Sequence, residues 1–188
     1  TDRTLIESGR FYPPAARTAE ARLRFYASHF SIVEVDSSYY ALPSQRTAAL
    51  WVSRTPEDFV FDIKAFGLFT NHPVPQSALP RDIRQELPEE ARQKDRLYYR
   101  HVPEELRDDL WLRYREAVRP VHQAGKLGVV VFQFPPWFHP GRESLDHILT
   151  CQEKLPDYRL AVEFRNASWL AEDTRKATFD FLRQHGLA

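Results

Sequence analysis

Residues 127–134 read LGVVVFQF, an almost unbroken apolar run that turns polar only at its glutamine. Val and Phe favour extended backbone, and a run of this length is typical of a strand buried inside a sheet. Segments of the same kind lie at residues 31–40 (SIVEVDSSYY), 59–66 (FVFDIKAF) and 160–165 (LAVEFR). The sequence therefore predicts a sheet of short, buried strands.

Amphipathic segments separate these strands. Apolar side chains recur at helical spacing in residues 16–30, 44–54, 144–155 and 173–185, and Ser44 stands where a helix N-cap is expected. Strand followed by helix, repeated along the chain, is the pattern of parallel βα units with right-handed crossovers. The length of 188 residues fits a single domain over residues 1–188.

Residues 76–125 depart from this pattern. They are dense in Arg, Glu, Asp and Pro, and their helical pieces break at Pro88 and Pro103. The interval is far longer than an ordinary βα connection. We expect a helical insertion that forms a lid over one end of the sheet, with interleaved charges that make a solvated surface rather than a nucleic-acid site.

The polar residues of the strands all fall on one face. Side chains two positions apart share a face, and each strand has one apolar face and one that turns polar towards its C-terminal end. An open doubly wound sheet is apolar on both faces, so the pattern favours a parallel (β/α) barrel of the TIM type with a polar mouth. The alternative is a structural ion-pair network inside the barrel. The charged positions are Glu34, Asp62, Lys64, Glu163 and Arg165.

Composition narrows the classes of partner. Lys and Arg total 26, as do Asp and Glu, so no net charge draws the chain to nucleic acid or to an anionic membrane. Cys151 is the only cysteine, which fits a reducing compartment, and no apolar run approaches the roughly 20 residues that cross a bilayer. We expect a cytoplasmic protein without a membrane partner. Since it contains no methionine, we also expect an excised or incomplete sequence.

Several segments resemble, in order and spacing, the YecE-like family (domain of unknown function 72). They are GRFYPP at residues 9–14, HFSIVEVDSSYYALPS, TPEDFVFDIKA, VVVFQFPPWF and LAVEFRNASW. The resemblance covers nearly all of the chain and implies a TIM-barrel-like fold. It also implies that this barrel is incomplete, because the family's first strand is absent apart from a possible remnant at residues 1–8, and the C-terminal strands are absent too.

The resemblance also implies a set of functional positions, which agrees with the face deduced from the strands. Glu34, Lys64 and Glu163 are the catalytic candidates. The substrate-binding candidates are Tyr39, His72, Gln133, Arg165 and Trp169.

The chemistry of these residue types leaves several roles open. Glu34 and Glu163 could act as paired carboxylates or as ligands to a divalent metal. Lys64 could hold a phosphate or carboxylate, or burial could lower its pKa so that it serves as a base. Arg165 suits an oxyanion, and His72 titrates near neutral pH.

Aromatic side chains could line the mouth and suit a sugar or base ring. Tyr39, Tyr40, Phe138 and Trp169 are the candidates, although packing is the favoured role for Tyr40 and Phe138.

These features favour an enzyme, a hydrolase or an isomerase, acting on a phosphorylated or sugar-like small molecule at the barrel mouth. One alternative is a metal-assisted nucleic-acid binding or processing protein resembling the endonuclease IV barrel. Another is a non-catalytic ligand-binding or scaffold protein. The sequence contains no HExxH, CxxC, phosphate-cradling Gly-rich or GxSxG motif, and its substrate, metal dependence and oligomeric state stay open.

Overall fold

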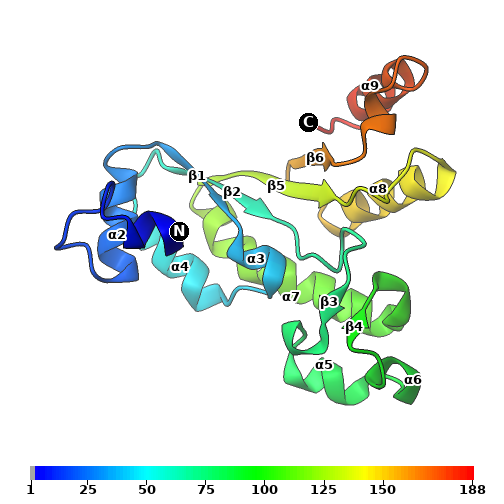
Figure 1. The fold of residues 1–188 in the computed structure, drawn as a ribbon, viewed down its shortest axis with the longest axis horizontal. Coiled ribbons are helices and arrows are strands. Elements are labelled where there is room, and N and C mark those ends of the chain that lie inside the picture. The colour runs from blue at the N-terminus through cyan, green and yellow to red at the C-terminus, as the bar shows by residue number, and fades with distance from the viewer. Residues whose placement is uncertain (1–2) are drawn as a thin grey trace.

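A computed structural model describes residues 3–188 as an α/β protein built on a parallel sheet. The strand order is β1-β2-β5-β6, and each neighbouring pair runs parallel (Figure 1). The predicted strands are thus confirmed, with the α/β class and the parallel topology. They are β1 (Ile32–Val35), β2 (Val60–Lys64), β5 (Leu127–Phe134) and β6 (Leu160–Phe164).

Over the described residues these strands form an open sheet, and its two edges differ. Beyond β6, the amide of Ala188 donates to Leu160 O (3.0 Å), and the Ala188 carbonyl accepts from Val162 N (2.7 Å), which is the bonding pattern of a parallel ladder. Before β1, α1 (Arg3–Glu7) is helical, so residues 3–7 of the expected strand remnant are not a strand, and residues 1–2 lie outside the described part. The parallel sheet with intervening helices is that of an α/β protein, and the strands do not close into a barrel within residues 3–188.

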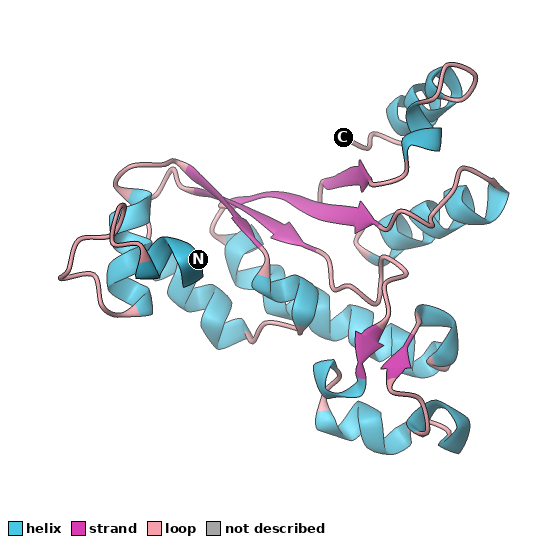
Figure 2. Cartoon of the chain, viewed as in Figure 1, coloured by secondary structure: helices cyan, strands magenta, loops and turns pink. Residues whose placement is uncertain are grey.

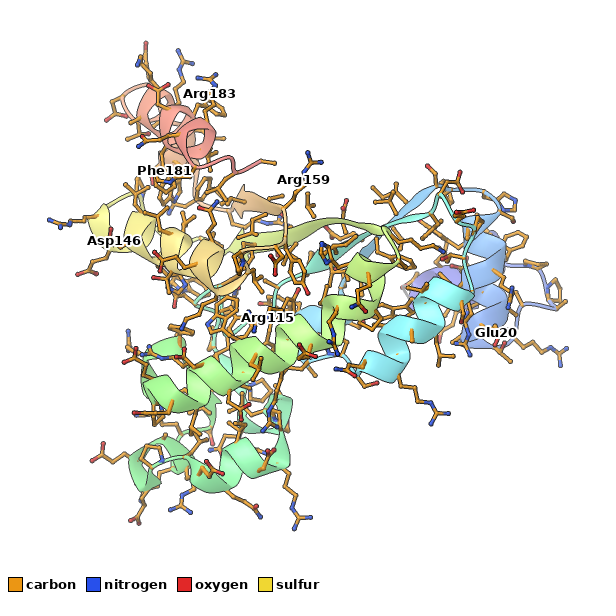
Figure 3. All side chains as sticks on the ribbon, turned by 180° about the vertical axis from the view of Figure 1, so that it is seen from behind. Glu20, Arg115, Asp146, Arg159, Phe181 and Arg183 are labelled. Atoms are coloured by element: carbon orange, nitrogen blue, oxygen red, sulfur yellow. The ribbon has the colours of Figure 1, made fainter. Side chains whose placement is uncertain are left out.

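Helices cover one side of this sheet. Figures 1 and 2 show α4, α7 and α8 along that side, while Figure 3 shows Glu20 of α2 and Arg183 of α9 at opposite ends of the molecule. Ser44 caps α4 as predicted, because its Oγ accepts from Thr47 N (3.1 Å). The main helices are α2 (Ala19–Ala27), α4 (Gln45–Ser53), α7 (Glu104–Gln123), α8 (Arg142–Lys154) and α9 (Arg175–Gln184).

The core lies between the sheet and these helices. Phe61, Ile63 and Phe132 project from the strands and are at most 1% exposed. Trp111 of α7 stacks on Phe69 with ring centroids 3.6 Å apart and also faces Phe132. Each large apolar side chain buried in this way contributes about 1.5–3 kcal/mol to folding. The apolar face predicted for the strands therefore meets the helices, which leaves the polar face on the other side.

The segment at residues 31–40 is a strand only in its first half. After β1 the chain forms a single helical turn, α3 (Ser37–Tyr40), where continued strand was expected. Ser38 explains the change, because its buried hydroxyl lies 3.0 Å from Val35 O and 2.7 Å from Lys64 O. Short polar side chains that bond nearby carbonyls favour turns over strands. This turn places Tyr39 at the C-terminal end of the sheet.

A bulge interrupts the pairing of β2 with β5. Phe61 pairs with Leu127 but Ile63 pairs with Val130, so β5 carries one extra residue here. The Val129 amide donates to Asp62 Oδ1 (3.0 Å), and a Cβ on Gly128 would lie only 2.3 Å from that oxygen. Asp62 thus bonds an amide in the bulge, and Gly128 leaves room for it.

The interval at residues 76–125 contains α5 (Arg81–Glu86), α6 (Glu89–Arg92) and α7, with Pro88 and Pro103 at the N-caps of α6 and α7 as the breaks predicted. A short antiparallel ladder of β3 (Val74–Pro75) and β4 (Arg96–Leu97) encloses the first two helices. Three 3-10 turns complete the elements, η1 (Gln76–Ala78), η2 (Tyr99–His101) and η3 (Ala167–Leu170). We call residues 74–97 the insertion lobe.

None of the helices in residues 3–188 combines the length and apolarity that crossing a membrane needs.

Candidate functional site

The polar side chains predicted for the strands share one face of the sheet. Residues paired across neighbouring strands, and residues two apart within a strand, point to the same side. Gln133 pairs with Glu163, and Lys64 pairs with Val131, two residues before Gln133. Glu34 pairs with Asp62, two residues before Lys64. The three catalytic candidates therefore lie on the side of the sheet opposite the core helices.

Lys64 forms the first group of charges, with two carboxylates around its ammonium. Its Nζ lies 3.1 Å from Glu34 Oε1 and 2.7 Å from Asp36 Oδ1. Burial opposes the charged form, but the hydrogen bonds to Asp36 and Glu34 outweigh it, so the pKa of Lys64 is raised. This geometry favours a permanently charged lysine over a lysine that acts as a base. We call these three residues the Lys64 cluster.

Glu163 forms the second group. Gln133 Nε2 donates to Glu163 Oε2 (2.6 Å), and Arg165 Nε lies 2.7 Å from Glu163 Oε1. Both carboxylate oxygens are thus held, while about two-fifths of the side chain stays open to solvent (39% exposed). We call these residues the Glu163 cluster. It fixes a carboxylate in one orientation, as acid–base chemistry requires.

No hydrogen bond or ion pair joins the two clusters within residues 3–188. Because Gln133 lies two residues beyond Val131, the partner of Lys64, it stands roughly 7 Å further along the strand direction and one strand across. The clusters therefore form two neighbouring patches at the C-terminal end of the same face.

His72 lies on the loop that follows β2 and contacts the ring of Tyr39, which the charge of Lys64 also reaches. Thr70 Oγ1 donates to Gly67 O (3.1 Å) and lies 2.9 Å from His72 Nδ1. A hydroxyl carries one hydrogen, so if Thr70 donates it to Gly67 O, the hydrogen of the second bond comes from Nδ1. We infer this Nδ1–H tautomer, which leaves the lone pair on Nε2. Burial lowers the pKa of His72, which keeps the ring neutral near pH 7.

A row of aromatic rings runs along this rim. Tyr39 touches both Tyr40 (centroids 5.1 Å apart) and His72 (5.2 Å), and His72 touches Trp137 (5.8 Å), each pair edge to face. Gly67 makes room for the row, since a Cβ there would lie 3.1 Å from the Tyr39 ring. We call these four rings the aromatic row. Its two ends are open, with Tyr40 70% and Trp137 53% exposed.

The structure corrects two expectations about the aromatic walls. Trp169 is only 1% exposed, stacks on Phe164 (4.1 Å) and donates Nε1–H to Phe138 O (2.6 Å), so it is a core residue that a ligand at the rim does not reach. Packing was the favoured role for Tyr40 over a place in the aromatic wall, yet its ring is 70% exposed. Phe138 is buried, as expected.

Sequence reasoning missed Trp137 and Thr70. Trp137 directly follows the two prolines after β5, so the sequence indicated that it lies near a strand end. The sequence did not indicate that its ring is exposed. Thr70 lies two residues before His72, a spacing at which a hydroxyl can reach a histidine, but many such pairs do not bond.

A hollow of about 740 Å³ lies beside the open edge of β1. Its lining includes Glu34 and Asp36 of the Lys64 cluster and the apolar side chains of Leu23, Tyr26 and Trp51. Within residues 3–188 no three His, Cys, Asp or Glu side chains converge as metal ligands, so none of these residues is assigned to a metal.

Comparison with known proteins places this arrangement in a family. The chain matches the model of "Protein of unknown function DUF72" over residues 2–188. It is 33% identical over 175 residues to the UPF0759 protein YunF of Bacillus subtilis (strain 168), an alignment that covers 93% of this chain and 53% of that protein. It is 28% identical over 180 residues to the UPF0759 protein YecE of Escherichia coli (strain K12), covering 94% of this chain and 53% of that protein.

Solved structures show the same likeness. A DUF72 family protein from Thermotoga maritima MSB8 superposes with a TM-score of 0.61 at 27% identity, over 93% of this chain and 55% of that one. A DUF72 family protein from Enterococcus faecalis V583 gives a TM-score of 0.68 at 23% identity, over 90% and 58%. The chain spans about half the length of the curated relatives it matches. On the family match over nearly its whole length, the chain belongs to the DUF72 family.

Proposed function

We propose that the C-terminal rim of the open face is the active site of an enzyme, a hydrolase or an isomerase, that acts on a phosphorylated or sugar-like small molecule. The observation that supports this most strongly is the state of His72. Burial lowers the pKa of the ring, its Nδ1 lies 2.9 Å from Thr70 Oγ1, and its Nε2 has no partner among the described residues, so that the inferred Nδ1–H tautomer leaves a lone pair on Nε2. A general base needs a group of this kind.

The neighbouring residues supply complementary roles. His72 Nε2 takes a proton from a substrate hydroxyl or an acidic C–H, and the electron pair of that bond stays on the substrate. The ammonium of Lys64, fixed by Glu34 and Asp36, keeps a third N–H that can donate a hydrogen bond to the oxygen that gains the resulting negative charge, although the two carboxylates balance its own charge. Glu163 serves as the second proton carrier, oriented by Gln133 and Arg165.

The aromatic row explains why a ring-bearing substrate fits this site. Tyr39 and Trp137 flank His72 and expose apolar ring surface next to the charged groups. Sugars and bases present both an apolar face and polar edges, so they match such a surface. Because the chain spans about half the length of its relatives, the substrate class proposed here is that of the full-length enzyme.

A panel of sugar phosphates tests this function. Turnover is measured for this chain and for a full-length relative, with His72→Gln and Glu163→Gln as test variants. His29→Gln is the control, because His29 is an exposed residue of the segment after α2 and outside the aromatic row. We expect each test variant to lose on the order of 10²–10⁴-fold in kcat while the control keeps it. No turnover of any panel member by the full-length relative, or full activity of His72→Gln, contradicts the proposal.

A further inference from the structure

The predicted anion-binding cations already have partners. The ammonium of Lys64 lies between two carboxylates, and the guanidinium of Arg165 lies against Glu163. A cation neutralised in this way attracts an incoming anion much less, because the anion has to compete with the carboxylates already bound. An anionic substrate therefore needs a different cation at this rim.

Arg96 of the insertion lobe meets this need. Its Nε and Nη2 donate to the carbonyl of Pro73 (3.3 and 2.9 Å), the residue directly after His72. Among the described residues no carboxylate lies within ion-pair distance of it. The two bonds to Pro73 hold the guanidinium in place and leave the N–H groups of Nη1 without a protein acceptor in that part of the chain. Arg96 is thus a positioned cation without a counter-charge.

The ladder of the insertion lobe fixes where this cation lies. Pro75 pairs with Arg96 across β3 and β4, which brings a residue that is distant in sequence next to the loop of His72. The positive charge of Arg96 also acts on Tyr39 of the aromatic row. Burial and the neighbouring Tyr40 raise the pKa of Tyr39, while the positive charges of Arg96 and Lys64 act on it in the opposite sense. Both cations therefore lie close enough to influence the same tyrosine.

We propose that Arg96 binds the oxyanion of the substrate, a phosphate or a carboxylate, beside His72 and Tyr39. The guanidinium presents parallel N–H groups that match two oxygens of such a group. Because the Arg96 side chain is already held by Pro73, it loses less conformational entropy when the anion binds. The inference deepens the proposed function, because it names the group that holds the substrate at that same site. It also gives the insertion lobe a role in recognition.

Binding of inorganic phosphate and of acetate, measured by isothermal titration calorimetry at low salt, tests this directly. Arg96→Met removes the guanidinium and keeps an apolar stem, while Arg96→Lys keeps the charge without the fork. Arg92→Met is the matched control, because Arg92 is exposed on α6 of the same lobe. Circular dichroism and thermal unfolding confirm that each variant folds.

We expect Arg96→Met to weaken phosphate binding about tenfold or more, because it removes the charge-assisted hydrogen bonds of the guanidinium. Arg96→Lys should fall between that variant and the unsubstituted chain, and Arg92→Met should bind as the unsubstituted chain does. Tighter binding of phosphate than of acetate identifies a phosphoryl group as the ligand, and the reverse identifies a carboxylate. Equal binding by Arg96→Met and the unsubstituted chain, or no binding of either anion, overturns the inference.

His72→Gln separates this inference from the proposed function. The substitution should abolish turnover but leave phosphate affinity within about twofold, since the imidazole is neutral and Arg96 carries the charge. If no reaction is found but anion binding still depends on Arg96, the proposed function fails and the binding site stands.

Discussion

Lys64 shows how two opposing effects on one side chain can be separated. Burial alone disfavours its charge, whereas Glu34 and Asp36 favour it, and the hydrogen bonds win. The balance matters for chemistry, because a charged lysine stabilises anions and a neutral one abstracts protons. Here Glu34 and Asp36 keep Lys64 charged, which excludes the role of a base.

Removing both acids should reverse the direction of the shift. In Glu34→Gln/Asp36→Asn only burial remains, so the pKa of Lys64 should fall below its ordinary value of 10.5. Carbon-detected NMR titration of the side chain, with the exposed Lys176 as internal control, measures it. An unchanged or higher pKa in the double variant would show that Glu34 and Asp36 do not hold the ammonium.

Thr70 should set the tautomer of His72. Thr70→Val keeps the shape but removes the hydroxyl, so Nδ1 loses its acceptor and the population should move towards the Nε2–H form. Thr70→Ser, which keeps the hydroxyl, should retain the Nδ1–H form. The ¹⁵N chemical shifts of the ring distinguish the two tautomers at pH 8, above the lowered pKa of His72. Identical shifts in all three proteins would refute the assignment.

At the scale of elements, the bulge in β5 determines which face each later residue of that strand takes. A strand alternates strictly, so one extra residue reverses the faces on either side of it. Because of the bulge, Leu127 pairs with Phe61 on the core side while Gln133 still reaches the open face beside Glu163. Gln133 owes its place in the site to this irregularity.

Asp62 and Gly128 should therefore be coupled in stability. Asp62→Ala leaves the Val129 amide without its acceptor and should cost about 1–3 kcal/mol, whereas Asp62→Asn keeps an acceptor oxygen and should cost less. Gly128→Ala places a methyl group against the Asp62 carboxylate. Urea unfolding of both single variants and the double variant should show a combined loss smaller than the sum. Additive losses would mean that the two side chains do not meet.

The sequence predicted the elements better than their connections. The four strands, the helices between them and the polar face follow from local alternation and helical spacing, which depend only on neighbouring residues, but β1 is a partly exposed edge strand rather than the buried one that was expected. The helical turn at Ser38 depends on a bond to Lys64 O, and the place of Arg96 depends on pairing with β3. Trp169 and Trp137 both lie in the loop after a strand, and the sequence does not show that packing buries the first and leaves the second exposed. In each of these cases the structure depends on contacts between residues that are distant in sequence.

At the scale of the whole molecule, β1 forms an edge of the sheet that pairs with no other strand of residues 3–188 on its free side. Ser31 O accepts from Val60 N on the β2 side, whereas the acceptor contact of Ile32 O in this part of the chain is with the Tyr26 hydroxyl (3.2 Å) on the other side. Strand alternation then directs the backbone groups of Ile32 and Glu34 to the free edge. Such edges favour association with other strands.

A charge on this edge strand should reduce that association. Ile32 is 47% exposed, so Ile32→Lys adds a solvated charge without opening the core. Sedimentation velocity over rising protein concentration should show self-association of the unsubstituted chain and less of it in the variant. The matched control, Leu112→Lys, alters an equally exposed residue of α7 (48%) and should behave as the unsubstituted chain does. Equal association in all three would place any contact elsewhere.

The open face of the sheet is proposed to carry a ligand site at the C-terminal ends of its strands. Titration with a sugar phosphate, followed by ¹H–¹⁵N correlation spectra, tests this site most directly. We predict shifts at the ends of β1, β2, β5 and β6 and at the indole N–H of the exposed Trp137, while the buried Trp111 and Trp169 stay unchanged. Shifts confined to α4, α7 and α8, or none at all, would contradict it.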